Sequence, residues 1–591
     1  MQSDSTFVSV GVHGARHESA QLPFPFASVV VPKQQSFRGY IFALFQSIVS
    51  GLILRICFFC ALPVLLPLHC ILFVLDHRNR NEVRRYQKEW RYKSVPHVRS
   101  LRFPASRKFP LENWHLRCED GRQRWHYGEL LNSEEGNVLG KAQASGLERL
   151  PSSNISIICA RYGQEAAENS ASYEDSKISE QKEERRRFLE HYQLGLIDAA
   201  PVKCRTNVVE AMRDGVEFLV SLQDPYSGHW PNDYSGPLFL TPGAVFVKFI
   251  VANGNIKKMF PPHADHHHKG NEACLCGEAE RLELIRYIRN YINDDGGFGQ
   301  HTEGHSTMLG TVLNYVALRF MGVSADDPDV VRARKWIHME GGAVSIPTWG
   351  KAWLSVVGLY SWEGVNPIPP EFSLLPEWFP FSQGRVWCHS RAVAVPLSYL
   401  YGTRWAMPLN GLLESLRAEL YVSPYHEIQW STHCSNICKR DCYTPLSPVY
   451  KFVAKCLKVY ERWHLKSLRE YALEVAWTHI AYDDESTHFI CLGPVNKALD
   501  MLVTWIREGE KSGRFLNHVD RLEDYFYMGP EGMRMSGYNG SQLWDTSFAI
   551  QAICACGMEM RYPREMALAH HYVDIAQVQE NPESGADFFR H

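Results

Sequence analysis

The stretch from Gly537 to Gly557 reads Gly-Tyr-Asn-Gly-Ser-Gln-Leu-Trp-Asp-Thr-Ser-Phe-Ala-Ile-Gln-Ala-Ile-Cys-Ala-Cys-Gly. Asn539-Gly540 is a turn signal, and Ser541 suits an N-cap because its hydroxyl can accept from a free backbone N–H of the first turn. Asp545 lies in the first turn, where the helix dipole favours an anion, and Gly557 can close the end. The stretch therefore predicts a helix with both ends specified.

The surface of this predicted helix is almost uncharged. At helical spacing one face carries Trp544, Phe548, Gln551, Ala552 and Ala555, and the next carries Leu543, Ser547, Ile550 and Cys554. A helix that is apolar nearly all round is typical of a buried position, so we expect this helix to be buried. On chemistry alone, Trp544 is then a core aromatic residue.

Part of this stretch is the last of seven motifs that occur in one order along the chain. They are Gly-His-Trp-Pro-Asn-Asp-Tyr-Ser-Gly-Pro-Leu-Phe at 228–239, Glu-Gly-His-Ser-Thr-Met at 303–308, Leu-Asn-Tyr-Val at 313–316, Ile-Pro-Thr-Trp-Gly-Lys at 346–351, Val-Trp-Cys-His-Ser-Arg at 386–391, Gly-Pro-Val-Asn-Lys at 493–497 and Gly-Ser-Gln-Leu-Trp-Asp-Thr-Ser-Phe-Ala at 540–549. Together they resemble the family of oxidosqualene cyclases, which fold a linear triterpene epoxide into lanosterol or a related sterol precursor. Any one motif is weak, but seven in order over roughly 205–591 are specific.

The composition agrees with a large protein that has ample apolar cores. The length of 591 residues exceeds that of one ordinary domain. A content of 45% hydrophobic and 12% aromatic residues is ample for large cores. A net charge of -3 gives no general electrostatic case for nucleic acid binding. The sixteen cysteines are scattered, so we expect them to be mostly reduced, as on a cytosolic face.

The N-terminal part divides into a tail and an apolar segment. Residues 1–40 lack periodicity and are expected to be disordered, whereas 41–75 are long and apolar enough to embed in a membrane, as one tilted span or a re-entrant hairpin. A dense basic cluster follows at 78–93, so the positive-inside rule puts the bulk of the protein on the cytosolic face. The resembled family sits in one leaflet without a span, so this segment is an addition to it.

Four further regions follow. Residues 76–130 are expected to form a basic linker and a stretch, 114–127, that is similar to the family's N-terminal segment, and 131–205 read as a polar, solvated insertion. Residues 206–480 are expected to form a first α/α barrel. Within it, 257–280 hold several His and Cys residues whose spacing fits no common zinc site, which favours a surface loop. Residues 481–591 would form an incomplete second barrel.

The barrel expectation has a basis in repeated units. Val216–Gln223 precedes Gly228-His-Trp230, and Tyr287–Asn293 precedes Gly297-Phe298, so each unit is a helix, a polar turn, a glycine and a ring. We expect the glutamine to accept from free N–H groups of the next helix while the ring stacks on a neighbour. This matches the repeated glutamine-tryptophan motif of triterpene cyclases. The expected fold is all-α, an α/α barrel toroid with one barrel complete and a second incomplete.

Polyene cyclisation needs an acid, a dry cavity and aromatic faces, which attract a carbocation by about 0.5–2 kcal/mol each without trapping it. By motif, the resemblance implies that Tyr234, Trp349, Trp387 and Trp544 line the cavity and that His389 is a base, or the partner of one, near the end of the cation cascade. Core packing is the plainer interpretation of each ring, and a hydrogen-bonded buried side chain that of the histidine. Asp483, Asp484 and Glu485 read as a feature of a helix end or of the surface.

The family's proton donor is the Asp of an Asp-Cys-Thr-Ala-Glu motif, which does not occur in these 591 residues. The resemblance therefore predicts that this chain alone is inactive, as a truncated gene model, a split gene or a degenerate copy. Two smaller departures border the expected substrate entrance: Ser390 replaces a family cysteine, and Ala394 stands where the family usually has a tyrosine.

The resemblance thus implies an isomerase that cyclises (S)-2,3-oxidosqualene without cofactor or metal. Its partners would be this substrate and membrane lipid, at the endoplasmic reticulum, another intracellular membrane or a lipid droplet. One alternative is a non-catalytic protein that binds squalene-like or sterol lipids. Another is a prenyl-transferring toroid, which would need a zinc-ligand set of Asp, Cys and His on the inner helices that is not apparent in the sequence.

Overall fold

A computed structural model of the chain describes residues 102–105, 109–119, 122–127, 171–197, 205–259, 277–376, 382–443, 446–537 and 542–577. The chain divides into two compact units, Met1–Leu75 and Asp76–His591, and all described residues belong to the second. The expected disordered tail, the membrane segment 41–75 and most of the His- and Cys-rich insertion, residues 260–276, lie outside the described residues.

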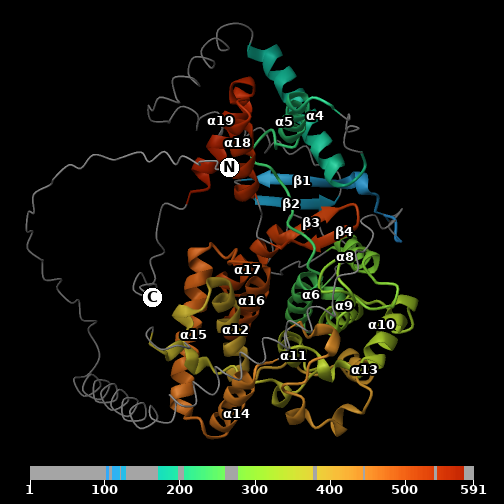
Figure 1. The fold of residues 1–591 in the computed structure, drawn as a ribbon, viewed down its shortest axis with the longest axis vertical. Helices are drawn as coiled ribbons and strands as arrows, with labels where there is room; N and C mark the ends of the chain where they lie inside the picture. The colour runs from blue at the N-terminus through green and yellow to red at the C-terminus, as the bar shows by residue number, and fades with distance from the viewer. Residues whose placement is uncertain are drawn as a thin grey trace, which may run out of the picture. The chain divides into compact units, whose positions relative to one another are not determined.

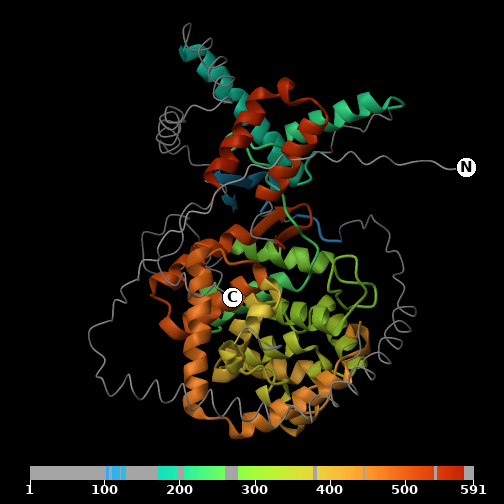
Figure 2. The same cartoon turned by 60° about the vertical axis from the view of Figure 1, so that its left-hand side comes forward.

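The described part is built mainly of helices (Figures 1 and 2). The α-helices are α4 (Ala171–Gln193), α5 (Val208–Ser221), α6 (Leu240–Val251), α7 (Ile256–Met259), α8 (Glu278–Asn290), α9 (Met308–Phe320), α10 (Pro328–Met339), α11 (Thr348–Val356), α12 (Cys388–Thr403), α13 (Gly411–Leu420), α14 (Pro448–Trp463), α15 (Lys466–Ser486), α16 (Pro494–Glu508), α17 (Gly513–Leu522), α18 (Gln542–Ala555) and α19 (Pro563–Ile575). The mainly helical fold class is confirmed.

Two small antiparallel hairpins accompany the helices. The first pairs β1 (Trp114–Glu119) with β2 (Arg122–Tyr127), and the second pairs β3 (Phe526–Gly529) with β4 (Gly532–Met535). Asp524, just before β3, accepts from Arg122 Nε at 2.8 Å and from Arg124 Nε at 2.8 Å. The β1–β2 hairpin lies in the stretch similar to the family's N-terminal segment, and these arginines fix it to a region 400 residues later in the chain.

The main hydrophobic core lies among central helices. In α9 every residue but Arg319 is buried, and all of α6 is buried. Phe249 of α6 stacks on Phe320 of α9 with ring centroids 3.7 Å apart. Helix α16 packs against both α6 and α12, so elements from early and late parts of the chain share this core.

The first repeated unit ties α5 to α18 and α19. Trp230 is buried and donates from Nε1 to Leu219 O at 2.7 Å, while its backbone N–H donates to Thr546 Oγ1 at 3.1 Å. Gln223 donates from its amide to Gly228 O at 2.7 Å and to Glu565 O at 2.9 Å. The expected partner of Gln223 was wrong, because the side chain bonds carbonyl groups, and the helices that the unit joins are not successive, because α18 and α19 lie more than 300 residues after α5.

The predicted helix at the C-terminal end of the described region forms, but it is not buried as we expected. Gly557 ends it with a positive φ of 65°, and Met558 N donates back to Ile553 O at 3.2 Å. Of the residues of α18, only Gln542, Thr546, Ala549 and Ile553 are buried. The face that carries Trp544 and Phe548 is exposed, so the end signals correctly predicted a helix, whereas the uncharged circumference wrongly predicted its burial. The expected turn and N-cap, 538–541, lie outside the described residues.

The structure also differs from the expected polar insertion at 131–205. Its last part is the helix α4, and Leu189 and Leu194 at the end of that helix belong to the main hydrophobic core. Glu190 is buried there and accepts from Leu116 N at 3.0 Å. Charged composition concealed this contact, because the buried residues among 178–193 of α4 lie in its last turn.

Among the described helices, none combines the length and the apolar character that crossing a bilayer requires.

Candidate functional site

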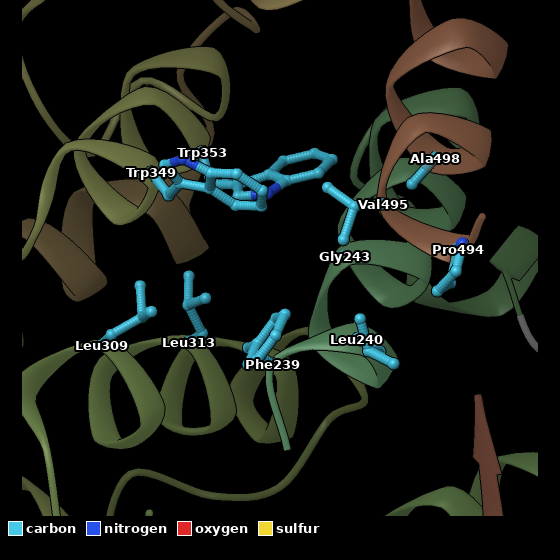
Figure 3. Close-up of a pocket in the computed structure, with 10 residues that line it drawn as sticks. All are labelled: Phe239, Leu240, Gly243, Leu309, Leu313, Trp349, Trp353, Pro494, Val495 and Ala498. Carbon is cyan, nitrogen blue, oxygen red and sulfur yellow. The ribbon is translucent and has the colours of Figure 1, made fainter. Parts of the chain in front are cut away.

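An apolar pocket lies where α6, α9, α11 and α16 meet (Figure 3). It is lined by Phe239, Leu240, Gly243, Leu309, Leu313, Trp349, Trp353, Pro494, Val495 and Ala498. The indole rings of Trp349 and Trp353 lie together on one side, across from the leucines of α9. The cavity volume is about 10 Å³, which is far too small for a triterpene chain.

Local sequence explains how the two indoles come to one wall. Trp349 and Trp353 are four residues apart on α11, so they lie one turn above each other on the same face. Lys351 points elsewhere and is buried, donating from Nζ to the backbone carbonyls of His433, Cys434 and Asn436. That lysine fixes α11 to the chain at 433–436 and keeps its charge out of the pocket.

Of the predicted wall residues, the structure brings only Trp349 to this pocket. Trp349 lines the pocket and remains 41% exposed. Its role as a wall residue stays a prediction, and the pocket provides the surroundings that the role requires: neighbouring rings and aliphatic side chains without a carboxylate.

Tyr234 lies in the loop between α5 and α6, outside this pocket. Its carbonyl accepts from Gly537 N at 2.6 Å, which places the loop against the end of the segment that follows β4. The neighbouring Asp233 is fixed by Arg534 Nε at 2.6 Å and by Ser536 Oγ at 2.5 Å. The ring of Tyr234 itself is mostly exposed.

Trp387 and His389 lie together at the start of α12. Their rings stack with centroids 4.4 Å apart, and His389 Nδ1 lies 3.3 Å from Cys388 Sγ. Trp387 is exposed and His389 is half-buried, so the expected alternative of a fully buried histidine does not hold. Neither residue lines the pocket, and the base role of His389 stays a prediction.

Trp544 is the fourth predicted wall residue. It is 60% exposed on α18, with its ring 6.1 Å from that of Phe548. Core packing, the plainer interpretation of this residue, is wrong in the structure. An exposed pair of aromatic rings on a well-formed helix suits a wall position, and that role likewise remains a prediction.

A buried polar cluster lies on the opposite face of α16 from the pocket. Lys497 donates from Nζ to Phe489 O at 2.6 Å and to His518 Nδ1 at 2.9 Å. The other nitrogen of His518 lies 3.1 Å from Asp484 Oδ2, and both side chains are fully buried. Our interpretation of Asp484 as a surface feature was therefore wrong, although it does lie at the end of α15.

Burial is the largest cause of the pKa shifts in this cluster. It raises the pKa of Asp483 to about 7, with the Asp484 carboxylate adding to the shift, and it raises the pKa of Asp500 well above the usual range. The pKa values of Lys497 and His518 are both lowered by burial. Asp483 and Asp500 can therefore hold protons at neutral pH.

The structure brings together an Asp, Cys and His set that sequence reasoning did not find. Ligand atoms of Asp484, Cys491 and His518 lie within 4.8 Å of one another, on α15, the following loop and α17. However, all three side chains are fully buried, and Lys497 already donates to His518. A metal ion would compete with that ammonium group, so the set fits a closed ionic network better than the zinc centre of a prenyl transferase.

Several pocket residues were within reach of sequence reasoning. Leu313 begins one of the family-like motifs, Pro494 and Val495 lie inside another, and Trp353 follows Trp349 by one helical turn. What the sequence could not give is which faces of α9, α11 and α16 meet. His518 carried no local signal at all, because its partners lie 21 and 34 residues earlier.

Comparison with known proteins adds independent information. The squalene-hopene cyclase N-terminal domain matches residues 276–490. The lanosterol synthase of Mus musculus is 43% identical over 384 residues, which are 65% of this chain and 49% of that protein. The cycloartenol synthase of Dictyostelium discoideum is 42% identical over 383 residues, or 65% of this chain and 51% of that protein. Protostadienol synthase A of Aspergillus fumigatus is 35% identical over 454 residues, or 76% and 59%.

The chain thus spans about half the length of the curated relatives that it matches most strongly. The matched domain contains α9, α11 and α12, and with them Trp349, Trp387 and His389. Seven motifs in family order and this level of identity over the matched part both support the oxidosqualene cyclase family.

Proposed function

We propose that the protein is a triterpene cyclase that converts (S)-2,3-oxidosqualene to lanosterol or a related sterol precursor. The observation that carries the proposal is the pair Trp349 and Trp353 over an apolar wall. The names of the relatives, lanosterol and cycloartenol synthases, support the reaction class. The reaction is an intramolecular isomerisation that consumes no cofactor.

In this proposal the wall does two things. Its aliphatic side chains exclude water, which would otherwise quench a carbocation, and its indole faces attract positive charge by about 0.5–2 kcal/mol each. Tyr234, Trp387 and Trp544 would supply further faces, and His389 would take up a proton late in the cascade. The half-buried imidazole of His389, stacked on Trp387, suits such a role because it is not sealed in the core.

The proposal includes the architecture and the location. We propose that residues 206–480 belong to a first α/α barrel and that residues 481–591 belong to an incomplete second one. The packing of α6 against α9 and of α12 against α15 supports the helix-on-helix arrangement of the first. We further propose that the protein works at the cytosolic face of the endoplasmic reticulum or another intracellular membrane, where its apolar substrate dissolves.

The source of the initial proton is open to direct test. The resemblance assigns it to the Asp of an Asp-Cys-Thr-Ala-Glu motif, which the 591 residues do not contain. The experiment is to make the protein from its own transcript, solubilise it in detergent and incubate it with labelled (S)-2,3-oxidosqualene. A cyclic triterpene alcohol identified by mass spectrometry supports the cyclase.

The second candidate, a non-catalytic lipid-binding protein, predicts a different result in the same assay. Labelled oxidosqualene would then bind saturably and be recovered unchanged. Absence of both product and saturable binding would contradict both functions.

A further inference from the structure

The loop that carries Tyr234 is held by distant parts of the chain. All of residues 231–236 are described and none belongs to a helix or strand, yet the loop forms hydrogen bonds with several segments outside it. The bonds run from Gln193 Nε2 to Pro231 O at 2.7 Å, from Gln123 Nε2 to Asn232 O at 3.0 Å, from Thr302 N to Gly236 O at 2.8 Å and from Leu238 N to Gln300 O at 2.8 Å. A loop that is attached at so many points is held in one conformation.

The attachment with the most charge is at Asp233, the residue before Tyr234. The carboxylate of Asp233 accepts from Arg534 Nε at 2.6 Å and from Ser536 Oγ at 2.5 Å. Both ionic side chains are nearly excluded from solvent, with 2% of Asp233 and 11% of Arg534 exposed. The guanidinium group of Arg534 also lies over the ring of Tyr527, 5.1 Å from its centroid. The loop is therefore fixed to β4, on which Arg534 lies.

Gly537, two residues after the end of β4, touches Tyr234 directly. Gly537 N donates to Tyr234 O at 2.6 Å. A Cβ atom added at Gly537 would lie 2.5 Å from that oxygen and 2.9 Å from Cδ1 of the tyrosine ring. Both distances are well below van der Waals contact, so the absence of a side chain at Gly537 lets the ring lie where it does. The contact places the ring although 60% of Tyr234 is exposed.

The buried ion pair of Asp233 and Arg534 is better suited to fixing geometry than to adding stability. Removing two charged groups from water is costly, and apolar side chains of similar volume often give equal or greater stability at such sites. Charge-assisted hydrogen bonds, in contrast, have a defined direction that apolar contacts lack. The side chain whose place depends on this direction is the neighbouring Tyr234, which the proposed function assigns to the substrate wall.

We propose that Asp233, Arg534 and Gly537 are positioning residues that hold the ring of Tyr234 against the substrate during cyclisation. The attraction between an aromatic face and a carbocation falls with distance, so a ring displaced by about 1 Å loses much of its effect. The three residues act through Tyr234 and not on the substrate. The proposal rests on the proposed cyclase function and adds the residues that keep one face of the wall in place.

Turnover of (S)-2,3-oxidosqualene in detergent tests the ion pair. Arg534→Met should lower kcat by about tenfold or more and change KM by less than about threefold, because substrate binding is spread over the whole apolar wall. Arg534→Lys keeps a charged donor for Asp233 and should recover most of that loss. Arg319→Met is the matched control, because Arg319 is also 11% exposed but pairs with Glu419 of α13 and not with the loop. The kcat of this control should match that of the wild type.

A second pair of variants keeps the test decisive if Arg534→Met does not fold. Gly537→Ala leaves the ion pair intact and displaces the carbonyl and the ring of Tyr234, so kcat should again fall by about tenfold. Gly513→Ala is its control, because a Cβ atom there would meet no atom of the described residues within 4 Å. Circular dichroism checks the fold of each variant.

The place of the ring can also be read without turnover. The full chain is made with 3-fluorotyrosine at position 234 only, and its fluorine resonance is recorded in detergent with and without squalene, which lacks the epoxide. If the ring lies on the wall, squalene should shift the resonance of the wild type. The shift should fall by about half or more in Arg534→Met and Gly537→Ala, and should be unchanged in both controls.

Four results would overturn the proposal. They are a wild-type kcat in Gly537→Ala or in folded Arg534→Met, a squalene shift that neither variant changes, no squalene shift in the wild type, and an Arg534→Lys variant as slow as Arg534→Met. Failure of the cyclase is seen separately. No product from the wild type, together with a shift that depends on Arg534 and Gly537, would contradict the cyclase alone. Product from the wild type, together with an unchanged shift in both variants, would contradict the positioning alone.

Discussion

The described chain contains two hydrophobic clusters of very different size. The main core includes α6, α9 and α16, where almost every side chain of α9 is buried. The smaller cluster joins α5, α18 and α19 through seven buried residues: Val216, Val220, Trp230, Ala549, Ile553, Met558 and Ala569. Helices α9 and α18 are both nearly uncharged in sequence, yet one is buried all round and the other on one face.

The difference in burial between α9 and α18 shows that a sequence can predict that a helix is covered without predicting which element covers it. Apolar residues around a helix indicate that it will be covered, but they do not indicate by what. In α9 the covering elements are its own helical neighbours, whereas the Trp544 and Phe548 face of α18 is uncovered among the described residues. Such a face is suited to contact something other than the described core, which is what a substrate wall requires.

The largest expected effect tests the main core. Phe320→Ala removes a fully buried ring that stacks on Phe249, so it should lower the free energy of unfolding by about 3–5 kcal/mol. Urea unfolding followed by tryptophan fluorescence measures the change. A loss below about 1 kcal/mol would mean that the stacked rings do not form in solution.

The next effect tests the buried face of α18. Ile553→Ala should cost about 2–3 kcal/mol, because Ile553 is fully buried in the smaller cluster. Since that cluster is separate from the main core, the cost should appear as faster amide hydrogen exchange in α5, α18 and α19. Equal acceleration in α9 would show that the two clusters unfold together.

A pH experiment tests the polar cluster beside α16. Burial raises the pKa of Asp483 to about 7, while in the unfolded chain this carboxyl has an ordinary pKa of about 4. Between these values the folded state holds a proton that the unfolded state has lost, so stability should fall as pH rises through this window. Asp483→Asn should flatten the fall and stabilise the protein at pH 8, by up to about 4 kcal/mol for a three-unit difference in pKa, as measured by urea unfolding at several pH values. An unchanged pH profile in the variant would contradict the shift.

The smallest expected effect is that of Phe548→Ala, which makes the same substitution as Phe320→Ala on an exposed helix face. Phe548→Ala on the exposed face of α18 should change stability by less than about 0.5 kcal/mol, because the ring is already 57% exposed. A cost near that of Phe320→Ala would mean that this face is covered in the protein. That result would remove the contrast between the two helices.

Sequence reasoning reached the mainly helical fold and the helix around Trp544, because capping residues and periodicity act locally. It also reached Trp349, through a motif. It missed the end of α4, whose charged turns hide a buried contact, and the polar cluster of Asp484 and His518. Those features depend on which helix faces meet, and side chains distant in sequence determine that.

The most direct measurement of the central claim is turnover of (S)-2,3-oxidosqualene by wild type, Trp349→Phe and Trp349→Ala in detergent. If Trp349 forms part of a wall that attracts a carbocation, Ala should lower kcat about tenfold or more, whereas Phe, which keeps a π face, should lose less than about fivefold. Met339→Ala, at an exposed position on α10, should match the wild type. Equal kcat values for wild type and both Trp349 variants would contradict the assignment of this pocket to the substrate wall.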